Sequence, residues 1–327
     1  LDSLLNATRT NNTTAESKIN EILKNSSLEL DGKATLLLAR SRLKMLHEKT
    51  RLLTGTDEDT ALLSLFDSIR SDDKNYQSNT ENGRQKYLTL IVDKLVEIES
   101  LAPLLIDLPI HAELNLMGFD NENSTNGSIF NYDQINATLE VDLTDMRHLP
   151  SFELESIAHF YGVPGLHTLA SAHDRFEIQS LQRLRDYDNG WAAYINTNLD
   201  RIPLYQHPIK VLERTYFELF FVSMAIVDYS INIQNQNNSE AIKFLTENSP
   251  YPPFRIERSL ALAHQYPGQY FGQFVGLLEF EALRQQAEKS LQGNFDMIDF
   301  HNHIVELGPL QFVELRGQME RWIDSKL

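Results

Sequence analysis

Side chains that could bind a metal ion or move a proton are spread over the second half of the chain. The strongest candidates are His159, His167, Asp188, Asp228 and His301. Imidazole and carboxylate groups are the usual protein ligands of zinc, and a carboxylate can act as general base on a metal-bound water. The same groups are also common as buried hydrogen-bonding residues. We treat the five as a candidate polar cleft, and we favour the structural role for the histidines and for Asp228.

Five short motifs give the second half of the chain a recognisable pattern. In order, they are DNGWAAY at 188–194, VDYSIN at 227–232, YPGQ at 266–269, FDMIDFHN at 295–302 and GPL at 308–310. As an ordered set they resemble the C-terminal half of a bacterial family known as domain of unknown function 885, which is similar to helical zinc peptidases. The resemblance covers roughly residues 110–327. It implies a gluzincin-like helical fold and, for the family, a zinc site with a glutamate as general base.

The stretch that corresponds to the family's metal-binding motif lacks most of its functional residues. The motif reads HExxPGHH in the family, and its Pro-Gly aligns it with this chain. Phe160 then stands at the first histidine, Tyr161 at the glutamate and Leu166 at the next histidine. His167 alone is retained. The resemblance therefore implies that zinc, expected in the family, has been lost here, which leaves no cofactor.

Other ligand positions of the family are substituted as well. Asn189 replaces the glutamate of the family's EGWA motif, and Asn232 replaces a histidine. An amide is a poorer zinc ligand than a carboxylate. His159 and Asp188 lie one residue from ligand positions, but one step along a helix turns a side chain by about 100°.

The substitutions are confined to residues that could do chemistry, whereas residues that serve packing are retained. Phe221, Met224 and Leu262 replace arginines of the family, and Gln273 replaces a tyrosine. Scaffold residues kept in the same motifs include Trp191, Asp228, Pro267, Gly268, Gly276, Phe300 and His301. Random drift would erode both sets equally. Selective loss of the chemical set therefore predicts a pseudoenzyme, a fold kept after catalysis was lost.

The composition excludes some classes of protein. The 327 residues include 29 Lys and Arg against 46 Asp and Glu, a formal net charge of −17, so we expect no nucleic-acid partner. The absence of cysteine excludes disulfides and thiol catalysis. The apolar run at 216–229 contains two acidic residues and is shorter than the ~18 residues of a membrane span, so it predicts a buried helix. The resemblance implies export, to the periplasm or as a lipid-anchored envelope protein of a Gram-negative bacterium, with the anchor upstream of this chain.

Hydrophobic periodicity predicts a mainly α fold with a small antiparallel β-sheet. Apolar residues at three- and four-residue spacing predict N-terminal helices from residue 31 and over 57–69 and 85–101. Alternation of apolar and polar residues predicts strands over 110–118 and 135–143. Further helices are predicted over 151–161, 164–184, 189–199, 207–231, 239–247, 253–264, 274–291, 296–306 and 309–325. We expect an N-terminal helical lobe over 1–105 and a second domain over 106–327, or one continuous domain.

Three functions are consistent with these features. The first is a non-catalytic, exported scaffold that binds a peptide or protein, and it accounts best for the lost ligands. In peptidases of this type a sheet edge binds substrate by strand addition, and one of the two predicted strands could keep that role. The second is an active metal-dependent hydrolase with a site rebuilt from His159, His167, Asp188 or His301. The third is a structural envelope lipoprotein without a ligand.

Overall fold

The computed structural model describes residues 15–57, 59–109, 112–120, 128–173, 185–199 and 202–327. These residues form a mainly α-helical protein with one small sheet, as the sequence predicted. Residues 15–25 are helical and are followed by α2 (Gly32–Thr54), α3 (Asp59–Ser71), α4 (Glu81–Leu101), α5 (Leu154–Tyr161), α6 (Leu166–His173), α7 (Arg185–Thr197), α8 (Pro208–Ile233), α9 (Asn238–Asn248), α10 (Pro253–Gln265), α11 (Gln269–Leu291), α12 (Met297–Leu307) and α13 (Phe312–Lys326). The helix predicted over 164–184 begins as α6, and its part from 174 to 184 lies outside the described residues.

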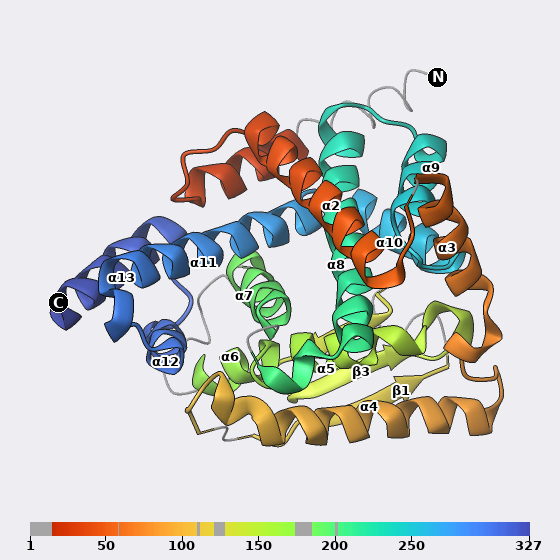
Figure 1. Ribbon diagram of the computed structural model, residues 1–327, viewed down its shortest axis with the longest axis horizontal. Helices are drawn as coiled ribbons and strands as arrows, with labels where there is room; N and C mark the ends of the chain where they lie inside the picture. The colour runs from red at the N-terminus through yellow and green to blue at the C-terminus, as the bar shows by residue number, and fades with distance from the viewer. Residues whose placement is uncertain (1–14, 58, 110–111, 121–127, 174–184, 200–201) are drawn as a thin grey trace.

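Helix α8 lies at the centre of the fold, with α2 lying across it (Figure 1). Pro208 begins the helix, at a position where the missing backbone N–H costs no hydrogen bond. Within the described residues, α8 alone is long and apolar enough to cross a membrane, but 83% of its most apolar window is buried inside the fold. A core helix meets the same criterion, so α8 is the buried helix that the apolar run at 216–229 predicted.

The N-terminal helices share their apolar core with the rest of the chain. Ile19, Leu36 and Phe66 belong to one cluster of buried side chains together with Leu219 of α8 and Phe274 of α11. Helix α3 packs against α9, and α4 packs against α5. Packing therefore crosses the boundary at residue 105, while the division into two domains stays a prediction.

The sheet is mixed, so the predicted antiparallel arrangement is wrong for one of its two strand pairs. Its strands are β1 (Asn115–Phe119), β2 (Phe130–Asp133) and β3 (Thr138–Asp142), in the order β1-β3-β2. β2 and β3 form an antiparallel hairpin, and β1 pairs in parallel with the other edge of β3. The prediction assumed one reversal of the chain between the two strands. The additional strand β2 lies between them in the sequence, so the chain reverses twice and β1 runs in the same direction as β3. Residues 110 and 111 of the predicted first strand lie outside the described residues.

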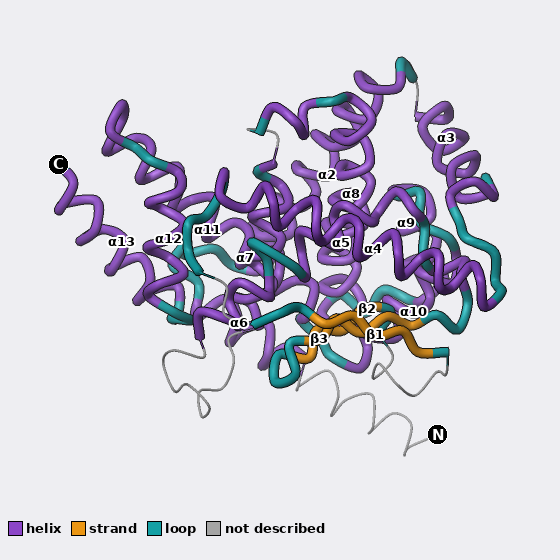
Figure 2. Tube along the Cα trace, turned by 90° about the horizontal axis from the view of Figure 1, so that it is seen from below, coloured by secondary structure: helices purple, strands orange, loops and turns teal. Residues whose placement is uncertain are grey.

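A second apolar cluster holds the sheet between neighbouring helices. It contains Tyr87 and Ile91 of α4, Leu139 and Val141 of β3, and Ile157 of α5. Figure 2 shows the three strands side by side at one border of the helical body. The β2–β3 hairpin and the start of α5 are thereby fixed against each other.

Two glycines allow α7 and α11 to pack closely. A Cβ atom on Gly190 would lie 2.5 Å from the Cα atom of Gly276, a separation that real Cβ atoms do not reach. The indole Nε1 of the neighbouring Trp191 donates a hydrogen bond to the carbonyl oxygen of Pro164, at 2.8 Å. These contacts fix the rotation of α7 about its axis and therefore the direction of Asn189.

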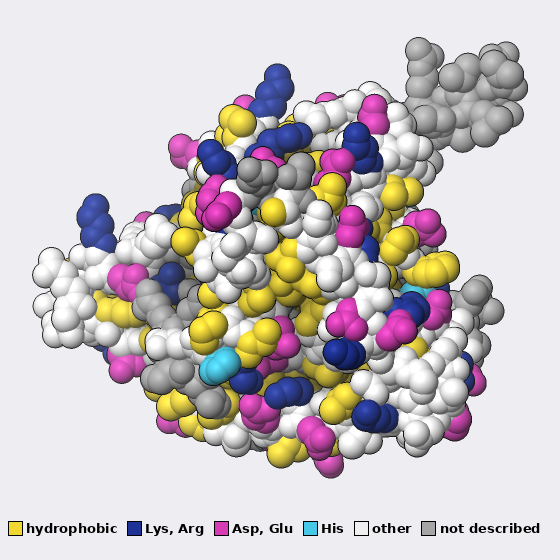
Figure 3. Space-filling view, turned by 45° about the vertical axis from the view of Figure 1, so that its right-hand side comes forward, with side chains coloured by type: hydrophobic (Ala, Val, Ile, Leu, Met, Phe, Trp, Pro, Cys, Tyr) yellow, Lys and Arg dark blue, Asp and Glu magenta, His cyan; other side chains and the backbone are white. Residues whose placement is uncertain are grey.

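The molecular surface carries charges of both signs. On the face drawn in Figure 3, hydrophobic side chains gather in the middle, and acidic and basic side chains are interspersed around them. Although the formal net charge of the chain is −17, this face does not carry a continuous acidic patch.

Candidate functional site

A cavity of about 130 Å³ lies where β2, α5, α7, α8, α10 and α11 meet. Its apolar wall includes Phe160 of α5, Phe220 and Phe221 of α8, and Leu262 of α10. Its polar groups come from Ser128, Tyr161, Asn189, Arg255, Arg258, Ser259, Gln269, Tyr270 and Gln273. The cavity combines aromatic walls with a few hydrogen-bonding groups, which is the usual character of a ligand site.

Three of the substituted positions identified in the sequence face this cavity. Phe160 and Tyr161 come from the last turn of α5, and Asn189 comes from the first half of α7. The positions matched to arginines and a tyrosine lie there too, as Phe221, Met224, Leu262 and Gln273. Residues separated by more than a hundred positions in the sequence therefore meet in one place.

Two other substituted positions do not line the cavity. Leu166 is buried in the main apolar cluster. The Asn232 side chain donates from Nδ2 to the Asp228 carbonyl oxygen at 2.9 Å and to Asp228 Oδ1 at 2.8 Å. It also lies 3.2 Å from the Ala263 carbonyl oxygen, so Asn232 holds together the end of α8 and the end of α10.

His167 uses both ring nitrogens in hydrogen bonds within the protein. Nε2 lies 2.9 Å from the Ala112 carbonyl oxygen, and Nδ1 lies 2.8 Å from the Tyr132 hydroxyl. Because a carbonyl oxygen only accepts, Nε2 carries the proton. Burial lowers the pKa of His167, which favours the neutral ring, so Nδ1 accepts from Tyr132. The histidine retained from the motif therefore joins α6 to β2 and to the segment before β1.

His159 and His301 do not line the cavity either. His159 is 1% exposed and packs edge-on against Tyr205, with ring centroids 5.1 Å apart. Burial, followed by the charge of Arg214, holds the pKa of His159 well below its ordinary value. His301 is fully buried, with Nδ1 2.7 Å from the Leu105 carbonyl oxygen and Nε2 2.9 Å from the Tyr194 hydroxyl.

The two candidate aspartates are buried, and neither lines the cavity. Asp188 is 6% exposed on α7. The Asp228 carboxylate accepts hydrogen bonds from the backbone N–H groups of Gly268, Tyr270 and Phe271, at 2.8 to 3.1 Å. It thereby caps the first turn of α11, where N–H groups have no partner within the helix. Burial raises the pKa of Asp228 to about 6, and these hydrogen bonds oppose the rise.

None of the five residues of the candidate polar cleft lines this cavity, and a cleft formed by them stays a prediction. The histidines and Asp228 lie at separate junctions between elements, and each makes structural contacts there. Among the residues that the structure describes, no three His, Asp or Glu side chains lie close enough to hold a metal ion.

The donors that line the cavity do not suit the zinc ion implied by the resemblance. Zinc sites use thiolate, imidazole or carboxylate ligands, whereas the charged lining residues here are two arginines. Tyr161 stands at the position of the general base, but burial raises its pKa. Its hydroxyl stays protonated at neutral pH and cannot accept a proton from water.

The two arginines, Arg255 and Arg258, were not identified from the sequence. They lie three residues apart on α10, so they share one face of that helix. Arg255 Nη2 lies 3.2 Å from Glu153 Oε2, which also accepts a hydrogen bond from the Tyr251 hydroxyl at 2.9 Å. Arg258 Nη2 donates to Asp142 Oδ2 at 2.7 Å. The spacing of the arginines was visible in the sequence, but a pair of charges on a helix usually indicates a solvated face.

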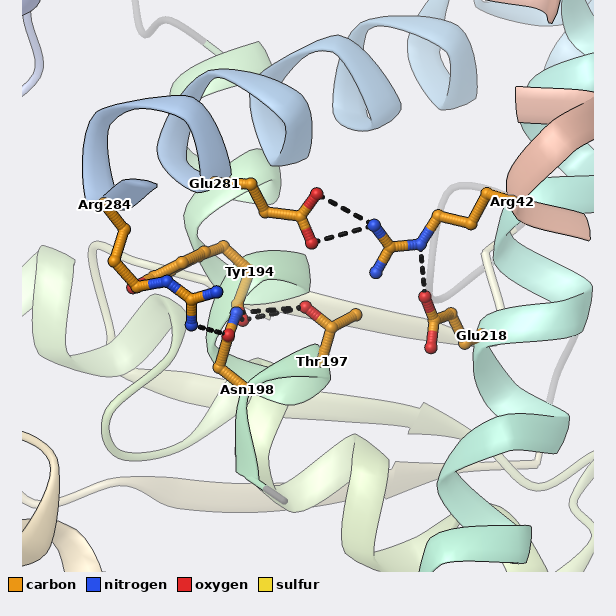
Figure 4. Close-up of polar contacts among 7 residues, drawn as sticks. All are labelled: Arg42, Tyr194, Thr197, Asn198, Glu218, Glu281 and Arg284. Atoms are coloured by element: carbon orange, nitrogen blue, oxygen red, sulfur yellow. Dashed lines mark hydrogen bonds and ion pairs between the residues drawn. The ribbon is translucent and has the colours of Figure 1, made fainter. Parts of the chain in front are cut away.

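A second group of charged residues lies elsewhere and joins helices (Figure 4). Arg42 of α2 donates to Glu218 of α8 at 2.6 Å and to both carboxylate oxygens of Glu281 of α11 at 2.8 Å. Arg284 of α11 donates to the side-chain oxygen of Asn198, after the end of α7. Arg42 therefore links α2 to α8 and α11, and Arg284 links α11 to the segment that follows α7.

Comparison with protein families gives one match over almost the whole chain. The model of the family described as "Bacterial protein of unknown function (DUF885)" matches residues 3–319. The match therefore extends through the N-terminal helices, beyond the residues 110–327 to which the motifs pointed. A comparison with curated proteins finds no match.

Two solved structures share the fold. A "putative lipoprotein from Colwellia psychrerythraea" superposes with a TM-score of 0.81 at 19% identity, over 95% of this chain and 55% of that one. A "putative lipoprotein of unknown function from Shewanella oneidensis" gives a TM-score of 0.73 at 15% identity, over 93% of this chain and 59% of that one. The present chain thus spans little more than half the length of these neighbours.

Proposed function

The chain belongs to the DUF885 family of bacterial proteins, and on that premise we propose that it is a non-catalytic member that binds a peptide or a segment of a protein in the cavity between α5 and α10. The observation that carries this proposal is the lining of the cavity. Phe160, Tyr161 and Asn189 stand where the resemblance expects two metal ligands and a general base.

The size and the walls of the cavity favour part of a ligand over a whole one. Pockets that enclose a complete drug-sized ligand have volumes of about 300–1,000 Å³. The volume of about 130 Å³ suits the end of a chain or one side chain. Amide groups of Asn189, Gln269 and Gln273 supply donors and acceptors that suit peptide groups.

The sheet supplies a second element that suits an extended ligand. β3 is paired on both edges, so the predicted strand 135–143 cannot add a further strand. β2 is an edge strand of the described sheet, and Phe130 on it lines the cavity together with Ile129. A peptide that adds along β2 by main-chain hydrogen bonds would deliver its end to the cavity.

We place this activity in the cell envelope. The support is that both structural neighbours bear the name putative lipoprotein. Fractionation of a Gram-negative host that expresses the gene with its natural upstream region tests the location. Recovery in the cytosolic fraction would contradict it.

A binding assay with a defined peptide mixture tests the function. The protein is incubated with N-acetylated tripeptides that differ in their last residue, and retained peptides are identified by mass spectrometry after gel filtration. We expect intact peptides on the native protein, fewer on Asn189→Phe, which fills the cavity, and no loss on Asn294→Phe at an exposed position.

Two results would contradict the proposal. Absence of any retained peptide on the native protein would favour a structural protein without a ligand. Cleavage of the peptides that a chelator abolishes would favour an active metal-dependent hydrolase.

A further inference from the structure

The buried part of the cavity wall and its half-buried part differ in chemistry. The buried part is mainly apolar and includes Phe160 of α5, Phe221 and Met224 of α8, and Leu262 of α10, each at most 7% exposed. The half-buried lining residues are mainly polar, namely Tyr161, Asn189, Arg258, Gln269 and Tyr270. A ligand therefore meets hydrogen-bonding groups where the cavity opens to solvent and apolar surface in its interior.

The polar side chains in the buried part of the wall are largely engaged by the protein itself. Ser259 forms a side-chain hydrogen bond with Tyr270. The Arg255 guanidinium lies over the ring of Phe130, at 5.2 Å from the ring centroid. Gln273 adds one amide group to the wall. The interior thus offers a ligand mainly van der Waals contact and the removal of apolar surface from water.

The charges of the two lining arginines are offset by buried carboxylates. Arg255 Nη2 lies 3.2 Å from Glu153 Oε2, and Arg258 Nη2 lies 2.7 Å from Asp142 Oδ2. Glu153 and Asp142 are both fully buried. A charged ligand group that entered the cavity would lose its hydration and would find no uncompensated charge of the opposite sign. The cavity therefore favours an uncharged group.

The volume of the cavity limits that group to one side chain. Apolar cavities of about 150 Å³ in other proteins hold a molecule of the size of benzene. At about 130 Å³, the present cavity suits the side chain of a leucine, a methionine or a phenylalanine, whereas the two fused rings of a tryptophan exceed it. A group that is too large binds weakly, because the packed wall would have to move.

From this lining, and resting on the function proposed above, we propose that the cavity takes up one uncharged apolar side chain of a bound peptide, of the size of leucine, methionine or phenylalanine. The side chain lies against Phe160, Phe221 and Met224. The peptide groups beside it lie at the half-buried amides of Asn189 and Gln269. The ligand is thus a peptide with an accessible apolar residue, and its charge does not select it.

The test measures the affinity of single peptides for the native protein by calorimetric titration. The peptides are N-acetyl-Gly-Gly-X amides, in which the residue X carries the only side chain and is Leu, Ala, Trp, Asp or Lys. We expect the Leu peptide to bind at least about tenfold more tightly than the Ala peptide, because more apolar surface leaves water. We expect the Trp, Asp and Lys peptides to bind at least about tenfold more weakly than the Leu peptide.

Two variants assign the preference to the cavity wall. Phe221→Leu enlarges the cavity, so we expect the affinity for the Trp peptide to rise at least about fivefold relative to the affinity for the Leu peptide. Phe312→Leu is the matched control, because Phe312 is 4% exposed in the apolar core and does not line the cavity. We expect this control to keep the native order of affinities.

The outcomes separate this inference from the proposed function. Equal affinities for the Leu, Ala and Asp peptides overturn the inference and leave peptide binding standing. Tightest binding of the Trp, Asp or Lys peptide by the native protein also overturns it, as does an unchanged order of affinities in a folded Phe221→Leu protein. Absence of binding of every peptide overturns both. The series on the native protein decides the matter even if Phe221→Leu does not fold.

Discussion

The carboxylate of Asp228, near the end of α8, accepts a hydrogen bond from the backbone N–H of Gly268, with an Oδ1–N distance of 2.9 Å. Gly268 adopts a left-handed conformation with φ of 84° directly before α11. A candidate for catalysis in the sequence is thus the residue that fixes where α11 begins. Because Gln269, Tyr270 and Gln273 of that helix line the cavity, Asp228 shapes the site without facing it.

We expect Asp228→Asn to destabilise the protein by about 2–4 kcal/mol, because the amide turns an N–H donor toward backbone N–H groups. The free energy of unfolding from urea titration measures this loss. Asp31→Asn is the matched control, since Asp31 caps α2 at an exposed position where asparagine serves equally well. Equal effects of the two substitutions would contradict the role given to Asp228.

The close approach of α7 and α11 predicts a large effect of one methyl group. We expect Gly190→Ala to lower the free energy of unfolding by at least about 1–3 kcal/mol, because its Cβ atom would collide with the backbone of Gly276. Gly293→Ala is the control, since no atom lies within 4 Å of its Cβ position, and we expect a change below about 0.5 kcal/mol. Thermal unfolding of both variants checks this, and a stable Gly190→Ala protein would show that the helices can move apart.

The hydrogen bond between His167 and Tyr132 allows a test of whether His167 has a structural role or binds a metal ion. A double-mutant cycle with His167→Phe and Tyr132→Phe should give a coupling energy of about 0.5–1.5 kcal/mol. The exposed pair His264 and Asn238, at 2.8 Å, is the reference and should give a value near zero. A coupling that appears only when zinc is added would contradict the structural role.

Glu153 predicts a dependence of stability on pH. Burial raises the pKa of Glu153 from 4.5 to about 7, and the charge of Arg255 and the Tyr251 hydroxyl oppose this rise. The folded state therefore binds more protons than the unfolded state between pH 4.5 and 7, and this contribution to stability is lost as the pH rises through that range.

The difference in unfolding free energy between the native protein and Glu153→Gln isolates this effect from the histidines. We expect the difference to fall from pH 5 to pH 7, by at most about 1.4 kcal/mol per pH unit. Urea titrations at three pH values measure it. A difference that stays constant over this range would show that Glu153 is ionised throughout.

Much of the fold could be predicted because it depends on local patterns. The apolar run at 216–229 predicted the buried helix α8, and Pro208 indicated its start. β2 was missed because its four residues, Phe130–Asp133, are too short to show alternation. The parallel pairing of β1 with β3 depends on how many times the chain reverses between them, which no local pattern records.

The residues of the candidate site could likewise be predicted only in part. The resemblance indicated Phe160, Tyr161 and Asn189, because residues at matching motif positions occupy matching places in a shared fold. Arg255 and Arg258 could not be recognised, because their partners Glu153 and Asp142 lie more than a hundred residues away. The histidines were ambiguous because an imidazole looks the same in a sequence whether it binds a metal or a carbonyl oxygen, and only the contacts of His167 and His301 distinguish the two.

The central claim is that the cavity binds a peptide ligand and no longer holds the metal ion expected in the family. Its most direct test is the metal content of protein purified without a histidine tag, after incubation with zinc and removal of loosely bound ions. The account predicts far less than one zinc per chain and no hydrolysis of the tripeptide mixture. One tightly held zinc per chain that is lost on Asn189→Ala, together with chelator-sensitive hydrolysis, would contradict it.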